Sequence, residues 1–312
     1  MRYSGVGGQA VMEGIMMKNQ DKYAVAVRKP DRNIEIKVED YKGVVQKKAI
    51  RNLPLVRGVI SFIESLYLGM ETLTYSASFF EDEEEKKEDK PVTEEEKEKQ
   101  LKKEKRQEKV LLGGTVAFSV VLALAIFFVL PYGLSCLLGK VVENPWIIAI
   151  FEGVIRLCIF IGYIGCISFM PDIRRVFMYH GAEHKCINCI EHGLELNVEN
   201  VRKSSRLHKR CGTNFIIIVM LISIVVFLFI RVETGWLRLV LRLLLIPVIA
   251  GISYEFIRLA GKYENWFTNI FSKPGMWMQK LTTREPEDDM IEVGIASVEA
   301  VFDWKKWQEE EK

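Results

Sequence analysis

The sequence has little net charge and no apolar segment near its N-terminus. Its 43 Lys and Arg residues are balanced by 41 Asp and Glu residues, so the formal net charge is +2. With so little excess positive charge, specific DNA binding is not expected. Residues 1–40 are polar and glycine-rich, so no cleavable signal peptide is expected. No Gly-Lys-Ser/Thr follows Gly5, Gly7, Gly8 and Gly14, which argues against a phosphate loop and favours a tight turn.

Histidine and cysteine are scarce, and they are concentrated in one segment. The chain has four histidines and six cysteines. All of the histidines and half of the cysteines lie close together in the sequence, at His180, His184, Cys186, Cys189, His192, His208 and Cys211. Imidazole and thiolate groups are the usual protein ligands of zinc and of other transition metals. This segment is therefore the best candidate for a site with chemistry.

Charge is nearly absent from several long apolar stretches, and these predict membrane-spanning helices. A stretch of roughly 17–25 apolar residues is long enough to cross the ~30 Å hydrocarbon core of a bilayer. Four stretches qualify, the third of them short: Leu111–Leu134, Trp146–Phe169, Phe215–Ile230 and Trp236–Ala260. The predicted fold is therefore a mainly α-helical membrane protein with about four transmembrane helices.

The distribution of Lys and Arg predicts the orientation of these spans. Positive residues are concentrated before the first span and in the segment 171–214, whereas the connection between the first two spans has almost none. Because cytoplasmic loops are enriched in Lys and Arg, both termini and the His/Cys loop 171–214 are expected on the cytoplasmic side of the cell membrane. Three arginines run against this assignment, since they would lie at or near the outer face: Arg231, Arg238 and Arg242.

Composition divides the chain into five segments. They are the N-terminal glycine-motif region 1–50, an amphipathic helix 53–80, a charged linker 81–109, a four-span membrane region 110–260 and a cytoplasmic tail 261–312. In the first, Tyr23–Arg28 and Ile34–Val38 alternate apolar and polar residues around a polar turn, which predicts a β-hairpin. The amphipathic helix is expected to lie on the membrane surface or to pack beside the spans, because its charged residues disfavour a spanning position.

The motif Tyr179–Lys185 reads Y-H-G-A-E-H-K. On a helix, His180 and His184 lie one turn apart and point the same way, with Glu183 beside them. Two imidazoles at this spacing can share one metal ion, and Glu183 is then a candidate general base that activates a water. The pattern H-x-x-E-H is also that of the inverzincin metallopeptidases.

A third metal ligand is needed, and the sequence leaves its identity open. Cys211, His208 and His192 are the candidates. The pair Cys186 and Cys189 forms a lone C-x-x-C, which is a weak signal for a metal site. Two other interpretations remain: a purely structural zinc site, and an interfacial helix whose His and Arg side chains meet lipid headgroups.

Four motifs resemble the YqhQ-like family of bacterial multi-span membrane proteins, a domain of unknown function that has been labelled a predicted metal-dependent enzyme. They are Gly7–Gly14, Tyr179–Lys185, Arg210–Thr213 and Thr283–Pro286. The resemblance covers nearly the whole chain apart from the charge run. It implies functional roles for these residues: His180, Glu183, His184, His208, Cys211 and Glu13. It does not extend to Cys186 and Cys189, which argues against a C-x-x-C site.

Three functions are compatible with these features. The first is a metal-dependent hydrolase at the inner membrane face, with a divalent metal expected to be zinc and with Glu183 as base. The second is a non-catalytic membrane factor whose basic loop docks a ribosome, a translocon, another membrane protein or membrane lipid. The third is a small transporter built on Glu152 and Arg156, which lie on one face of the second predicted span. These two charges are more simply interpreted as a structural ion pair.

Overall fold

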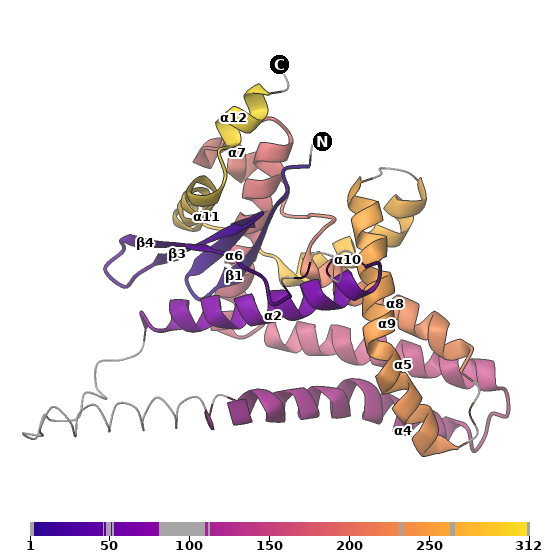
Figure 1. Cartoon of the computed structure of the whole chain (residues 1–312). Coiled ribbons are helices and arrows are strands. Elements are labelled where there is room, and N and C mark those ends of the chain that lie inside the picture. The colour runs from indigo at the N-terminus through magenta and orange to yellow at the C-terminus, as the bar shows by residue number, and fades with distance from the viewer. Residues whose placement is uncertain are drawn as a thin grey trace, which may run out of the picture. The chain divides into compact units, whose positions relative to one another are not determined.

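The computed structural model describes residues 3–45, 47, 51, 53–80, 110–111, 113–230, 232, 234–262 and 266–310. These residues fall into two compact units, Met1–Phe80 with Ile161–Lys312 and Glu81–Phe160. Helices predominate, and an N-terminal sheet belongs to the first unit (Figure 1). The predicted charged linker 81–109 lies outside the described residues.

The N-terminal region forms a four-stranded antiparallel sheet rather than a hairpin alone. Its strands follow one another in the order β1 (Val6–Val11), β2 (Gly14–Asn19), β3 (Lys22–Arg28) and β4 (Ile34–Asp40). The predicted hairpin is β3 and β4. The glycine motif, predicted to be a tight turn, forms β1, a tight turn and the start of β2. The turn between them is at Met12 and Glu13, where Glu13 has a φ of 47°.

Close packing explains why two glycines lie in these strands. A Cβ at Gly14 would lie 2.5 Å from the carbonyl oxygen of Ala26. A Cβ at Gly8 would lie 2.8 Å from the carbonyl oxygen of Met16 and 2.9 Å from Cγ of Glu183. Because a larger residue would collide with backbone at both positions, glycine is required here for proximity and not for a positive φ.

Both faces of the sheet are covered by helices. Ile15, Met17 and Ala26 face a core shared with α6 (Pro171–Glu191) and α11 (Asp288–Val301). The alternate residues of β2 and β3 pack with α2 (Val56–Ala77) on the opposite face. The short helices α7 (Val198–Lys203) and α12 (Trp304–Glu309) complete the layer on the side of α6 and α11.

The first unit also contains two apolar helices and one amphipathic helix. They are α8 (Gly212–Leu228), α9 (Gly235–Lys262) and α10 (Trp266–Thr282). α9 contains a stretch, Gly235–Ala260, that is long and apolar enough to cross a membrane. α8 is the third predicted span, and at 17 residues it is shorter than such helices usually are.

The described residues contain three helices long and apolar enough to span a membrane, together with the shorter α8, where the sequence predicts four spans. The other two long helices are Gly113–Leu138 and Pro145–Ile167. The difference lies in the third span, which is short in the sequence and forms the 17-residue helix α8. The cytoplasmic orientation of the termini and of segment 171–214 stays a prediction.

In the second unit, a buried ion pair satisfies a backbone carbonyl that a proline leaves without its usual helical hydrogen bond. The helix Gly113–Leu138 contains a π-helical turn, Ala125–Val129, followed by α4 (Leu130–Leu138). Pro131 has no N–H to donate to the carbonyl of Phe127 one turn earlier. Arg156, on α5 (Pro145–Ile167), donates its Nε–H to that carbonyl at 3.0 Å and pairs with Glu152 at 2.9 Å. These contacts agree with the interpretation of Glu152 and Arg156 as a structural pair.

Replacing one member of this pair is expected to lower the stability of the protein by more than the net stabilisation that the ion pair provides. Glu152→Ala or Arg156→Ala leaves a buried charge without its ion-pair partner, which costs about 3–5 kcal/mol in a protein interior. The double substitution removes both charges and should cost less than the sum of the two single ones. The thermal unfolding midpoints of the three variants in detergent measure this, and additive losses would contradict it.

Candidate metal centre

Helix α6 carries the His/Glu motif into the interior of the first unit. Pro171 occupies the first turn, where its missing N–H is tolerated, and Asp172 adds a favourable negative charge. From Tyr179 to Glu191 nearly every residue is buried, because β1, β2, α11 and the segment 204–211 pack around this half of the helix. Gly181 is part of this packing, since a Cβ there would lie 2.0 Å from the carbonyl oxygen of Arg284.

Three potential metal ligands converge at this point of α6. One ligand atom from each of His180, His184 and Cys211 can be chosen so that all three lie within 4.8 Å of one another. The ring centroids of the two histidines are 4.4 Å apart, and Nε2 of His180 lies 3.2 Å from Sγ of Cys211. Cys211 is the N-cap of α8, where its sulfur accepts a hydrogen bond from the backbone N–H of Thr213 at 3.4 Å. We call these three residues the triad.

The outer ring nitrogens of the triad are held by backbone carbonyls. Nδ1 of His180 lies 2.8 Å from the carbonyl oxygen of Thr282, and Nδ1 of His184 lies 2.7 Å from that of Arg206. A carbonyl oxygen can only accept, so each Nδ1 carries the hydrogen and each neutral ring has its lone pair on Nε2. This is the arrangement that metal-binding histidines generally have.

Two buried polar atoms at the triad have no hydrogen-bond partner among the described residues: His184 Nε2 and Glu183 Oε2. Both side chains are almost inaccessible, with 1% and 5% of their surface exposed. A buried polar atom without a partner is costly, and an unseen ion or water is a usual explanation. The two imidazole nitrogens and one sulfur of the triad are also a donor set that suits zinc.

Electrostatics favours the ligand form of the cysteine. Burial raises the pKa of Cys211, but the positive charge of His180 and His184 outweighs burial and lowers that pKa well below its ordinary value. Burial lowers the pKa of His180, and the thiolate beside it reverses the effect and raises the pKa to about 9. Burial raises the pKa of Glu183, although the two histidines oppose this. A thiolate is the form of cysteine that binds metal.

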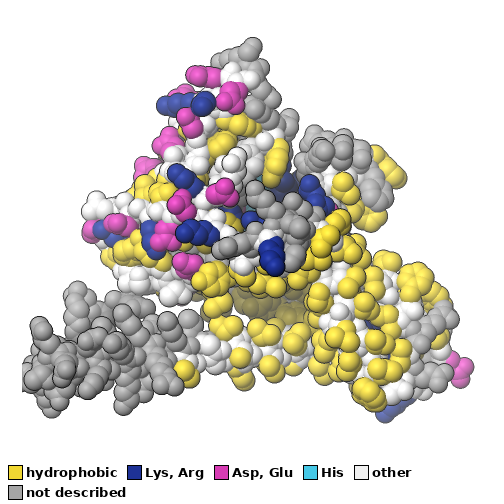
Figure 2. All heavy atoms as spheres, viewed as in Figure 1, with side chains coloured by type: hydrophobic (Ala, Val, Ile, Leu, Met, Phe, Trp, Pro, Cys, Tyr) yellow, Lys and Arg dark blue, Asp and Glu magenta, His cyan; other side chains and the backbone are white. Residues whose placement is uncertain are grey.

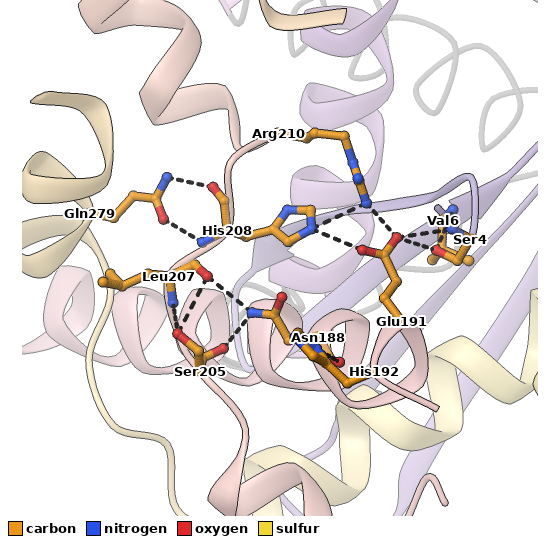
Figure 3. A network of polar contacts seen from close by, with 10 residues as sticks. All are labelled: Ser4, Val6, Asn188, Glu191, His192, Ser205, Leu207, His208, Arg210 and Gln279. Atoms are coloured by element: carbon orange, nitrogen blue, oxygen red, sulfur yellow. Dashed lines mark hydrogen bonds and ion pairs between the residues drawn. The ribbon is translucent and has the colours of Figure 1, made fainter. Parts of the chain in front are cut away.

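His208, predicted as a ligand, lies outside the triad in a separate polar network (Figure 3). Its ring centroid is 5.7 Å from that of His184, but its Nε2 lies 3.6 Å from a carboxylate oxygen of Glu191. Glu191 also accepts hydrogen bonds from Ser4 and Arg210. The side chain of Gln279, on α10, accepts from the N–H of His208 and donates to its carbonyl, both at 2.8 Å. The network therefore anchors the chain just before Cys211.

The remaining sequence candidates have other partners. Glu13 forms an ion pair with Arg175 and accepts a hydrogen bond from Tyr179 at 3.2 Å, and it does not belong to the triad. Nδ1 of His192 lies 2.7 Å from the carbonyl oxygen of Asn188. Cys186 and Cys189 are fully buried and do not belong to the triad.

The residues that orient the triad were not found from the sequence. Thr282 and Arg206 contribute only backbone carbonyl oxygens to these contacts. Every residue has such an oxygen, so the side-chain type does not reveal this role. One signal was available in the sequence, because the tail contains acidic residues that could pair with the basic segment 171–214. Glu285 does so, and its carboxylate lies 3.0 Å from Lys185 and 3.3 Å from Arg206. These ion pairs hold the tail close to the carbonyl groups of Thr282 and Arg206.

A family model described as "Protein of unknown function (DUF1385)" matches residues 53–304. The chain belongs to this DUF1385 family. A relative from Bacillus subtilis (strain 168), described as "Uncharacterized protein YqhQ", is 34% identical over 293 residues, covering 93% of this chain and 90% of the relative. The predicted resemblance to YqhQ-like proteins is thereby confirmed. The range matched by the DUF1385 model contains the triad and Glu183 but not the sheet. No solved structure matches the chain.

Proposed function

We propose that His180, His184 and Cys211 bind a divalent metal ion, and that the ion is zinc. The observation that carries this proposal is the convergence of one ligand atom from each of His180, His184 and Cys211, with each Nδ1 held by a backbone carbonyl. An ordinary pair of buried histidines would satisfy both nitrogens of each ring, whereas Nε2 of His184 has no hydrogen-bond partner among the residues described. Three protein ligands are also the number that catalytic zinc sites use.

We further propose that the site is hydrolytic, with Glu183 as general base. Bound zinc supplies a Lewis acid and lowers the pKa of a water to about 7. Glu183 is adjacent to His184 in sequence, and its Oε2 has no hydrogen-bond partner among the described side chains and backbone. Burial raises the pKa of Glu183, and this direction makes its carboxylate a stronger base. The sequence order of H-x-x-E-H supports the same roles for His180, Glu183 and His184.

Glu183→Gln is expected to retain the metal and to lose about 10²–10⁴-fold of any hydrolytic rate, since general-base catalysis contributes that much. The purified full chain, loaded with zinc, is assayed against a panel of ester, amide and phosphoester substrates, with metal content measured on the same samples. Glutamine keeps the size of the side chain, so a loss of metal is not expected. Any activity that Glu183→Gln leaves unchanged does not come from the proposed site.

The assay also discriminates a second candidate. His180 and Cys211, 3.2 Å apart, resemble the base and nucleophile of a cysteine hydrolase, and Cys211 lies at a helix N-terminus. Activity in metal-free protein that requires Cys211 but survives Glu183→Gln would favour this dyad. Zinc content near one ion per chain would favour the metal site.

Docking of a ribosome, a translocon or another membrane protein through the basic loop stays a prediction. Several basic side chains of that loop already form ion pairs within the chain. The pairs are Arg175–Glu13, Lys185–Glu285, Arg202–Asp288, Arg206–Glu285 and Arg210–Glu191. The loop therefore offers less unpaired charge to a partner than the sequence indicates, and this favours the metal-site proposal.

A further inference from the structure

Most large apolar side chains of helix α2 lie on the outside, and its buried face consists mainly of small residues, together with Glu64 and Leu68. The outward side chains are 41–63% exposed: Phe62, Ile63, Leu66, Tyr67, Met70 and Leu73. The residues buried against the protein include Gly58, Gly69, Thr72 and Ser76. A helix on a water-soluble surface has the opposite arrangement, with apolar residues facing the core. A contiguous apolar surface of this kind marks a contact with another molecule or with a membrane.

The inner face of α2 is too closely packed for the helix to rotate and bury these side chains. A Cβ at Gly69 would lie 2.5 Å from the side chain of Gln9 on β1. A Cβ at Gly58 would lie 2.6 Å from Cβ of Tyr254 on α9. The small residues therefore fix which side of the helix faces outward.

The contacts of α2 show where it crosses the apolar helices of the same unit. Arg57 pairs with Glu255 near the C-terminal end of α9. The ring centroid of Phe62 lies 5.6 Å from that of Phe215, in the first turns of α8. α8 and α9 pack together and are joined by a short connection, so the start of α8 and the end of α9 lie at the same end of the pair. In Figure 1, α2 runs across α9 rather than along it.

We propose that α2 lies flat on the membrane surface, with its outer face at the boundary between lipid headgroups and acyl chains. Because α2 crosses α8 and α9 at one end, a bilayer spanned by α9 has its surface near α2. Its 22 residues are about 33 Å long, so the helix would cover a wide strip of that surface. The occupant is lipid and not a second chain, because α9, a candidate span that contacts α2, also exposes large apolar side chains, at Val248, Ile252 and Leu259.

Two further features support lipid as the occupant. Tyr67 on α2, and Trp266 and Trp277 on α10, are 56–77% exposed, and such aromatic side chains are enriched at the headgroup level of membranes. In Figure 2, charged side chains gather over the sheet and α11, and hydrophobic ones gather over the apolar helices. The proposed position of α2 depends on α9 spanning the membrane, and it does not depend on the proposed metal site. It also puts Cys211, which directly precedes α8, close to the same surface.

Spin labels along α2 test this placement in the full chain. The exposed cysteines Cys136, Cys158 and Cys166 are replaced by alanine, and single cysteines replace Leu66, Met70 or Leu73. The protein is reconstituted in vesicles of phosphatidylethanolamine and phosphatidylglycerol. Immersion depth is then measured from collisions with oxygen and with a water-soluble nickel chelate, and the parent without an added cysteine gives the background. Labels at Leu244 in α9 and Ile36 in β4 are the deep and the aqueous references.

All three α2 labels are expected at one shallow depth, about 5–10 Å below the headgroups. They should be less accessible to nickel than the label at Ile36 and less deep than the label at Leu244. A depth that increases steadily along α2 would mean that the helix spans the bilayer. Nickel accessibility equal to that at Ile36 would mean that no lipid contacts it, and protection from both reagents would mean that another protein chain covers it. Each of these three results would overturn the proposal, whether or not the triad binds zinc.

Discussion

Replacing both His180 and His184 by alanine is expected to reduce the zinc content from about one ion per chain to background. The two imidazoles supply two of the three protein ligands, and a single remaining thiolate cannot hold zinc in competition with a chelator. His184 is buried and His180 is partly buried, both beside Cys211, so water cannot readily replace the two imidazoles as ligands. The measurement is elemental analysis of purified protein after dialysis against a weak chelator.

Two histidine variants serve as controls for this experiment. His192→Ala removes the imidazole at the C-cap of α6, whose Nδ1 lies 2.7 Å from the backbone carbonyl oxygen of Asn188 and which does not belong to the triad. His208→Ala removes a histidine that the sequence predicted as a ligand and that the structure places beside Glu191. Both variants should retain zinc. Loss of zinc in His208→Ala with an unchanged unfolding midpoint would show that the triad is not the complete ligand set.

Gly181→Ala is expected to weaken zinc binding about 10–100-fold and to lower the unfolding midpoint. Its Cβ would lie 2.0 Å from the backbone carbonyl oxygen of Arg284, which no side-chain rotation can relieve. The segment Thr282–Arg284 must therefore move, and Thr282 supplies the carbonyl that orients His180. Loss of such an orienting hydrogen bond typically costs metal sites this factor in affinity. Overpacking adds about 1–3 kcal/mol of destabilisation.

The matched control for Gly181→Ala is Gly212→Ala, beside Cys211. A Cβ at Gly212 meets no atom of the described residues within 4 Å, so this substitution should change neither zinc affinity nor the unfolding midpoint appreciably. Zinc affinity is measured by competition with a chromogenic chelator, and unfolding is followed by circular dichroism in detergent. Equal behaviour of the two variants would contradict the role given to the Gly181–Arg284 contact.

The periodic parts of the fold were predictable from the sequence, and the glycine-interrupted parts were not. Strict alternation predicted β3 and β4, and long apolar runs predicted Gly113–Leu138 and α9. β1 and β2 were missed because Gly7 and Gly8 interrupt the alternation, and the reason for Gly8 is the approach of Glu183 from a distant helix. Contacts between residues so far apart in the chain leave no local pattern to read.

The candidate site was also predictable only in part from the sequence. The spacing of His180 and His184 placed both rings on one face of a helix, since that relation depends only on helical geometry. The choice between Cys211 and His208 depends on how the segment 204–211 folds back on α6. Gln279 and Glu191 hold that segment with His208 turned toward Glu191, and so leave Cys211 beside His180. No spacing rule could have decided between two residues only three positions apart.

X-ray absorption spectroscopy of the zinc-loaded full chain tests the central claim most directly. The account predicts one sulfur at about 2.3 Å from zinc and at least two imidazole nitrogens at about 2.0–2.1 Å. It also predicts that the sulfur contribution disappears in Cys211→Ala and persists when Cys186 and Cys189 are both replaced by alanine. A shell with several sulfurs, or a sulfur signal that depends on Cys186 and Cys189, would contradict the proposed triad, as would a zinc-loaded protein with no sulfur ligand.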